Sequence, residues 1–181
     1  LAKSGTGTLT LNGSNTYTGI TTINAGTIQI GHANALGTTA NITFSGGGLQ
    51  YGTGITQDLS GRIKNSSSAI LIDTNSNDVT FASVLDSTNS GGLTKNGTGT
   101  LTLNATNAYT GTTTINTGTL QIASAGLLGS GNYSGNISNS GAFVFGSNSN
   151  QTLSGNISGI GSLTKNGSGV LTLTGTSSFN G

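Results

Sequence analysis

Several short runs of the chain alternate strictly between aliphatic and polar residues. Residues 8–11 read Thr-Leu-Thr-Leu, residues 27–30 read Thr-Ile-Gln-Ile, and residues 100–103 again read Thr-Leu-Thr-Leu. A period of two places aliphatic side chains on one face of a strand and Thr or Gln on the other. The runs are separated by turn sequences such as Asn-Gly-Ser-Asn and Asn-Ala-Gly, and no stretch has helical spacing. The pattern predicts an all-β fold built from short strands.

The chain also repeats itself on a longer scale. Residues 1–31 and 93–123 are two copies of one repeat, identical at 22 of 31 positions without a gap. A third copy occupies residues 163–181, where the sequence stops inside the repeat. Self-similarity of this kind is typical of solenoids.

The segments between the copies are related as well. Residues 41–63 resemble residues 136–157, whereas residues 64–92 have no counterpart before the third copy. We therefore expect residues 1–181 to form a single β-helical segment in which residues 64–92 are an inserted coil.

The spacing of aliphatic residues predicts the length of one coil. One series steps by 19, 21 and 21 residues and a second by 19 and 21; they are Leu9, Ile28, Leu49 and Ile70, and Ile23, Ile42 and Ile63. About 20 residues form one coil, and each coil adds about 4.8 Å, so eight or nine coils make a rod on the order of 40 Å long. Crossovers between parallel strands are nearly always right-handed, so the expected fold is a right-handed parallel β-helix. Four turn asparagines are expected to stack as amide ladders, namely Asn12, Asn24, Asn104 and Asn116.

Composition agrees with this fold and excludes some functions. The chain is 31% hydrophobic and 5% charged, with 32 Gly and no Pro, Cys, Met or Trp. With a net charge of +1, the chain lacks the basic surface that nucleic acids require. The longest aliphatic run, residues 69–72, is far shorter than the roughly 20 residues that cross a bilayer. We expect no nucleic-acid partner and no membrane-spanning segment in this part of the protein.

The second copy carries four recognisable motifs: Gly-Thr-Leu-Thr-Leu at 99–103, Tyr-Thr-Gly at 109–111, Thr-Thr-Ile at 113–115 and Gly-Thr-Leu-Gln-Ile at 118–122. Together they resemble the passenger-associated β-strand repeat of autotransporters, which are proteins of Gram-negative bacteria that export an N-terminal passenger through a C-terminal β-barrel. The resemblance implies a right-handed β-helix at the cell surface or outside the cell, often adhesive or self-associating. It assigns no functional residue, because the repeat is a structural signature.

An enzyme is the first alternative, because β-helices also include polysaccharide lyases and hydrolases. Such enzymes cluster carboxylates to hold Ca²⁺ or to act as acid and base. This chain has no Glu, one histidine (His32) and four aspartates, which are Asp58, Asp73, Asp78 and Asp86. We therefore expect no catalytic residue and no cofactor.

Residues 73–78 follow the first half of a calcium-binding loop. Asp73, Asn75 and Asn77 place oxygens at alternate positions, but Asp78 stands where the loop needs Gly, and Val84 where it needs a bidentate Glu. A polar turn is the preferred interpretation, and these three residues are a weak candidate for a metal site.

Two side-chain types recur at fixed repeat positions. Lys3, Lys95 and Lys165 are interpreted as charges at turns, which keep the repeat soluble and discourage wrong strand pairing. Tyr17, Tyr109 and Phe179 are expected to pack in the core or at corners rather than to form a sugar-binding stripe. The Gly-rich residues 45–48 are expected to form a turn or bulge.

The predicted function is structural: a stiff stalk that supports adhesion or self-association through flat Thr, Ser and Asn faces. Expected partners are neighbouring coils of a larger chain or other copies of itself, since open strand edges recruit partners, and host or bacterial surface ligands. Ice binding is a second alternative because outward Thr pairs recur, although it needs an uninterrupted Thr array.

Overall fold

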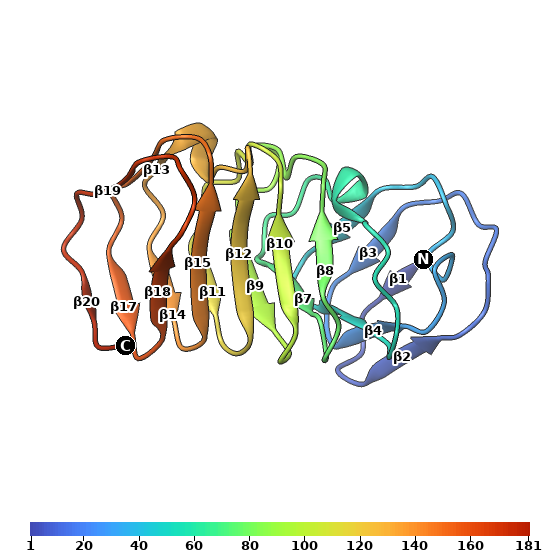
Figure 1. The fold of residues 1–181 in the computed structure, drawn as a ribbon. Coiled ribbons are helices and arrows are strands. Elements are labelled where there is room, and N and C mark those ends of the chain that lie inside the picture. Colours follow the sequence, from blue (N-terminus) through green and yellow to red (C-terminus); the bar gives the residue numbers. More distant parts are fainter.

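The computed structural model describes residues 1–181 as a β-solenoid of twenty short strands, with the two termini at opposite ends of an elongated molecule (Figure 1). All strand pairs are parallel. The largest sheet has nine strands, one for each coil. These strands are β2 (Thr8–Leu11), β4 (Thr27–Ile30), β6 (Gly48–Tyr51), β7 (Ile70–Asp73), β9 (Leu93–Asn96), β11 (Thr113–Ile115), β14 (Ile137–Asn139), β17 (Ile157–Gly159) and β20 (Ser178–Phe179).

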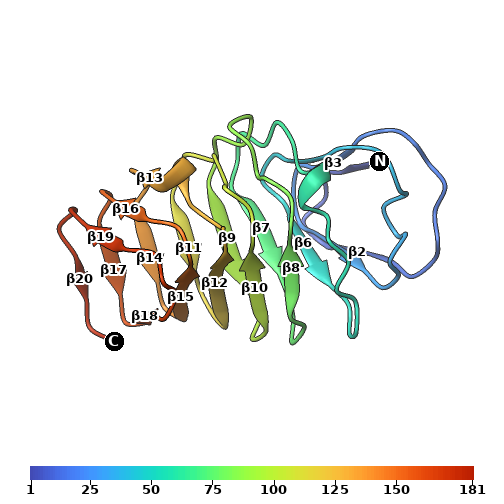
Figure 2. The ribbon, with the colours of Figure 1, turned by 45° about the horizontal axis from the view of Figure 1, so that its top comes forward.

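A five-stranded sheet follows the nine-stranded sheet within each of the later coils, and Figure 2 shows its strands side by side along the axis. Its members are β8 (Val79–Phe81), β10 (Thr100–Leu103), β12 (Thr119–Ser124), β15 (Ala142–Ser147) and β18 (Ser162–Lys165). Two three-stranded sheets precede the nine-stranded sheet in their coils. The N-terminal one contains β1 (Ala2–Lys3), β3 (Thr21–Ile23) and β5 (Ile42–Phe44), and the C-terminal one contains β13 (Asn132–Tyr133), β16 (Gln151–Leu153) and β19 (Leu171–Leu173). Single 3₁₀ turns, η1 (Ser60–Arg62) and η2 (Gly129–Gly131), interrupt the connections.

The register of the nine-stranded sheet confirms a coil of about 20 residues. One outward row runs through all nine strands, from Thr8, Thr27, Gly48, Leu71 and Thr94 to Thr114, Ser138, Ser158 and Ser178. Two predicted pairings are wrong by two residues: Leu49 pairs with Ile72, and Ile23 pairs with Phe44. Because a shift of two keeps a side chain on the same face, the inward assignment survives the error.

The core consists of stacked inward rows that run along the axis. Thirty buried residues form one hydrophobic cluster. In the five-stranded sheet one row contains Val79, Leu101, Leu120, Phe143 and Leu163. Leu101 and Leu103 have no exposed surface, while Thr100 and Thr102, which alternate with them, are partly exposed. The alternation therefore sorts side chains as the sequence predicts.

Successive repeat copies lie on different sides of the rod. The lysine strand of the first copy, β1, belongs to the N-terminal three-stranded sheet, that of the second, β9, to the nine-stranded sheet, and that of the third, β18, to the five-stranded sheet. The following Thr-Leu strands, β2, β10 and β19, are displaced in the same way. Each copy thus begins one face further along the path of the chain, and a repeated residue faces a new direction in each copy.

Candidate functional site

The recurring lysines are buried at two of their three positions, so their interpretation as exposed turn charges is wrong. Lys95 has no exposed surface, and Lys3 is 9% exposed; only Lys165 is exposed. Lys95 lies in the inward row of the nine-stranded sheet, between Ile72 and Ile115. The sequence carried a signal for this burial, because Lys95 has the same strand parity as the buried Leu93. The two residues are two positions apart on one strand and therefore point to the same face.

The Lys95 ammonium holds two stacked turns together. Nζ donates to the carbonyl oxygens of Asn96 at 2.9 Å, Gly97 at 2.8 Å and Thr117 at 3.3 Å. Gly118 above it has φ +66°, and a Cβ there would lie 2.9 Å from Nζ and 2.4 Å from a carbonyl oxygen, so only Gly fits. Burial lowers the pKa of Lys95 to about 8, although Asp73 and Asp78 act in the opposite direction.

The recurring aromatic residues pack inward to different extents. Tyr109 is fully buried, and its hydroxyl lies 2.9 Å from that of Thr113. The same Thr113 hydroxyl lies 2.7 Å from that of Tyr133, whose ring packs edge-to-face on Tyr109 at 5.7 Å. Burial raises the pKa of Tyr133 to about 12. Tyr17 and Phe179 are partly exposed.

The calcium candidates act as turn and inter-coil hydrogen-bonding groups. The Asp73 carboxylate accepts from the Asn75 amide at 2.7 Å and from Gln50 Nε2 at 2.8 Å. Asn77 is 8% exposed; its Oδ1 accepts from the Gly54 amide at 2.8 Å. These contacts account for the residue types at 73 and 77 without a cation, and Asn75 has a positive φ of 55°, which Asn adopts more readily than most residues.

The other aspartates are each engaged locally. Asp58 accepts from Ser60 and from the Ala82 amide. The backbone amide of Thr100, 2.8 Å away, lowers the pKa of Asp78. No three His, Cys, Asp or Glu side chains lie close enough together to hold a metal ion.

Asp86 forms an ion pair with Lys64 at 2.5 Å. Partial desolvation opposes ionisation, but hydrogen bonds from Lys64 and Thr88 outweigh it and lower the pKa of Asp86. His32 Nδ1 accepts from the Asn34 amide at 3.0 Å and so shapes a loop.

A side-chain ladder crosses four coils of the nine-stranded sheet. Thr10 donates to Gln29 at 3.2 Å, Gln29 to Gln50 at 2.8 Å, and Gln50 to Asp73 at 2.8 Å. This differs from the predicted stacking of the turn asparagines. Of those four, only Asn116 bonds to another amide side chain, that of Asn96 at 2.8 Å.

The outer face of the nine-stranded sheet does not carry a continuous Thr array. Its outward row is interrupted at Gly48 and Leu71, and becomes Ser from Ser138 onward. The single outward hydroxyl per strand in β11, β14 and β17 differs from the paired Thr rows on which the ice-binding alternative depended.

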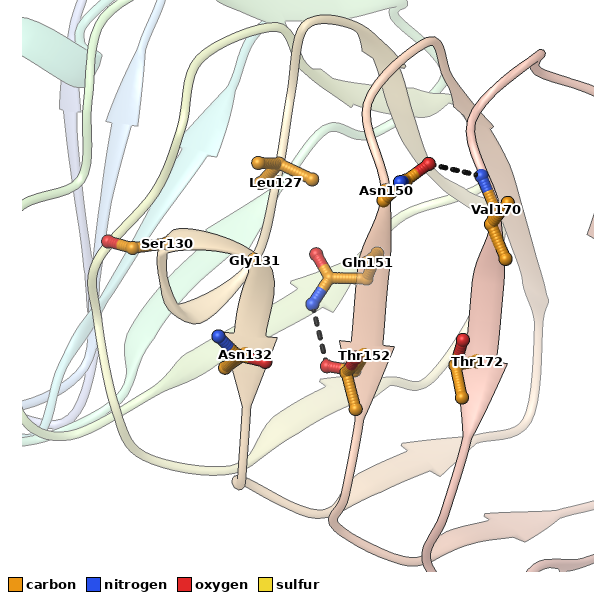
Figure 3. A pocket seen from close by; sticks show the side chains of 9 residues that line it. All are labelled: Leu127, Ser130, Gly131, Asn132, Asn150, Gln151, Thr152, Val170 and Thr172. Atoms are coloured by element: carbon orange, nitrogen blue, oxygen red, sulfur yellow. Dashed lines mark hydrogen bonds between the residues drawn. The ribbon is translucent and has the colours of Figure 1, made fainter.

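Two adjoining cavities lie beside the turn at residues 129–131. The larger, of about 480 Å³, lies over β13, β16 and β19 (Figure 3). The smaller, of about 390 Å³, lies between this turn and the edges of Tyr109 and Tyr133. Ser130 and Asn132 line both cavities, and neither cavity is lined by a charged residue. Sequence reasoning missed this region, because only the backbone path around Ser130 creates it.

The fold and these local contacts define a repeat-built parallel β-solenoid whose polar groups mainly stabilise turns. No helix of the structure has the length and apolar character needed to cross a membrane. Residues 1–30, 93–122 and 163–181 match the family model of the passenger-associated-transport-repeat.

Among curated proteins, the chain is similar to the adhesin BmaC autotransporter of Brucella suis biovar 1 (strain 1330), with 44% identity over 224 residues. The match covers 99% of this chain but 6% of that protein, so the chain spans only a small part of its relative's length. No solved structure gives a significant match. The three matched segments are the three repeat copies of the chain.

Proposed function

We propose that the chain is a stiff, non-catalytic stalk segment of an autotransporter passenger, exposed on the surface of a Gram-negative bacterium, where it supports adhesion. The observation that carries the proposal is the continuous core. Thirty buried residues between Ile23 and Ile157 form one hydrophobic cluster, and partly buried side chains of the two end coils pack against it. A rod with such a core bends little, because each coil is fixed to the next by strand pairing and side-chain stacking.

The similarity to an adhesin autotransporter supports the adhesive part of the proposal. The four aspartates support the non-catalytic part, since each is committed to a turn, an inter-coil contact or an ion pair. Partners at the surface are then other passenger coils, other copies of the chain or surface ligands of host and bacterium.

Antibodies raised against the 181-residue chain test the surface location. They should label intact cells of the source bacterium, and protease treatment of intact cells should remove the label. In-frame removal of these residues from the parent protein should reduce attachment while export continues. Labelling only after permeabilisation, or release of reducing ends from polysaccharides by the purified chain, would contradict the proposal.

A further inference from the structure

The larger cavity exists because the coil that contains β13 joins the C-terminal three-stranded sheet later in its path than the next two coils do. Strand pairing between β13 and β16 begins only at Asn132, which pairs with Thr152. The three preceding residues, Gly129, Ser130 and Gly131, all have positive φ, of 54°, 54° and 97°. A non-glycine residue in this region is uncommon, and Ser130 is held there by its backbone bond to Asn107 at 2.9 Å.

The Gln151 side chain fills the inner part of the resulting gap. Its Oε1 accepts from the Leu128 amide at 2.8 Å, and its Nε2 donates to the Leu128 carbonyl at 3.1 Å. Gln151 is 2% exposed, so its amide replaces the missing backbone pairing and forms the floor of the cavity (Figure 3). The outer part of the gap remains open.

Four side chains with unused hydrogen-bonding capacity line this open part. Asn132, Thr152 and Thr172 form one row along the axis, in register from β13 through β16 to β19, and Ser130 lies at its end. None of the four makes a side-chain hydrogen bond within the chain, in contrast to Asn150, whose Oδ1 accepts from the Val170 amide at 2.9 Å. Hydroxyl and amide groups both donate and accept.

We propose that this groove binds a short segment of a neutral, extended oligosaccharide that lies along the solenoid axis. A lining without charge gives no counter-ion for an anionic ligand and no carboxylate for a cation. A polyhydroxylated ligand matches side chains that donate and accept at intervals of about 4.8 Å. The volume of about 480 Å³ falls within the range of small-ligand sites.

The apolar residues of the groove fit the same ligand. Val170 is 59% exposed at one side, and Leu127 lies at the other. They offer small apolar surfaces to the C–H groups of a sugar ring, whose hydroxyls point to the polar row. The site adds a ligand to the proposed stalk, and its absence would leave the stalk proposal intact, because rigidity and surface location are measured independently.

The test is nuclear magnetic resonance titration of the ¹⁵N-labelled 181-residue chain with cellohexaose, maltohexaose and chitohexaose, and with hexagalacturonate as the anionic comparison. We expect saturable shifts of the backbone amides of Ser130, Asn132, Thr152 and Thr172 with at least one neutral hexasaccharide. Thr152→Val removes one hydroxyl at nearly constant shape and should weaken binding roughly three- to tenfold.

Thr114→Val is the matched control, since Thr114 faces outward on the nine-stranded sheet and lies outside the groove. It should leave the titration unchanged. The proposal is overturned by the absence of saturable shifts with all three neutral sugars, by a response to hexagalacturonate alone, or by equal weakening in Thr152→Val and Thr114→Val.

Discussion

At the scale of single residues, strand parity decides whether a position belongs to the core or the surface. Lys95 shows this most clearly. Its charge and its place beside a turn suggested exposure, but its parity with Leu93 placed it inside, where three carbonyl oxygens accept hydrogen bonds from its ammonium group. The alternation in residues 100–103 was predicted correctly, since no polar group there competes with burial. At Lys95, strand parity is thus a better guide than residue type.

Leu101 and Thr102 provide a paired test of parity. Leu101→Asp places an unpaired carboxylate at a position with no exposed surface and should destabilise the chain by about 4 kcal/mol or more. Thr102→Lys lies on the outer face and should change the free energy of unfolding by less than about 0.5 kcal/mol. Urea denaturation followed by circular dichroism measures both. Equal losses in the two variants would show that the inward and outward faces are misassigned.

Lys95 should make stability depend on pH in the alkaline range. Its folded pKa of about 8 lies below its unfolded value of 10.5, so between these values the unfolded state binds more protons. The free energy of unfolding should therefore rise between pH 7.5 and pH 9.5, by roughly 1 to 2 kcal/mol. Tyr109 and Tyr133, with raised pKa values, act in the opposite sense only above about pH 10.

The variant Lys95→Met isolates this effect, because it keeps most of the length of the unbranched side chain and removes the titrating group. Its urea denaturation should lose the rise between pH 7.5 and pH 9.5, whatever its stability at neutral pH. A slope that persists in Lys95→Met would assign the pH dependence to other groups.

At the scale of elements, the sequence predicted strands and coil length well but register less well. The steps along the nine-stranded sheet vary with the loops, and the coil that contains η1 places Ile72 rather than Ile70 beside Leu49. Spacing in the sequence cannot reveal how many residues a loop absorbs. The cavity beside η2 was not predictable for the same reason, because it depends on the left-handed path of residues 129–131.

The turn at residues 73–78 provides a test at this scale. Its candidate oxygens already accept hydrogen bonds from Gln50, Gly54 and Asn75, so a cation would have to displace them. Calorimetric titration with Ca²⁺ should show no binding tighter than about millimolar. Micromolar affinity that disappears in Asp73→Ala would establish a calcium site and contradict the interpretation as a turn.

At the scale of the whole molecule, nine coils form a rod, and each repeat copy starts on a different sheet. The rod was predicted from the coil length. The displacement of the copies was not predicted, because loops of unequal length change the sheet on which each copy starts. The predicted right-handed winding stays a prediction. Lys3, Lys95 and Lys165 consequently belong to three different sheets and do not lie in one row.

The most direct test of the stacked solenoid is electron-electron double resonance between pairs of nitroxide labels, which a chain without native cysteine accepts at chosen positions. Thr27 and Thr114 lie four coils apart in the outward row, and Thr27 and Ser158 lie six coils apart. The account predicts backbone separations of about 19 Å and 29 Å, so the second pair should be longer by about 10 Å. Equal separations, or a shorter distance for the second pair, would contradict the stacking of one coil on the next.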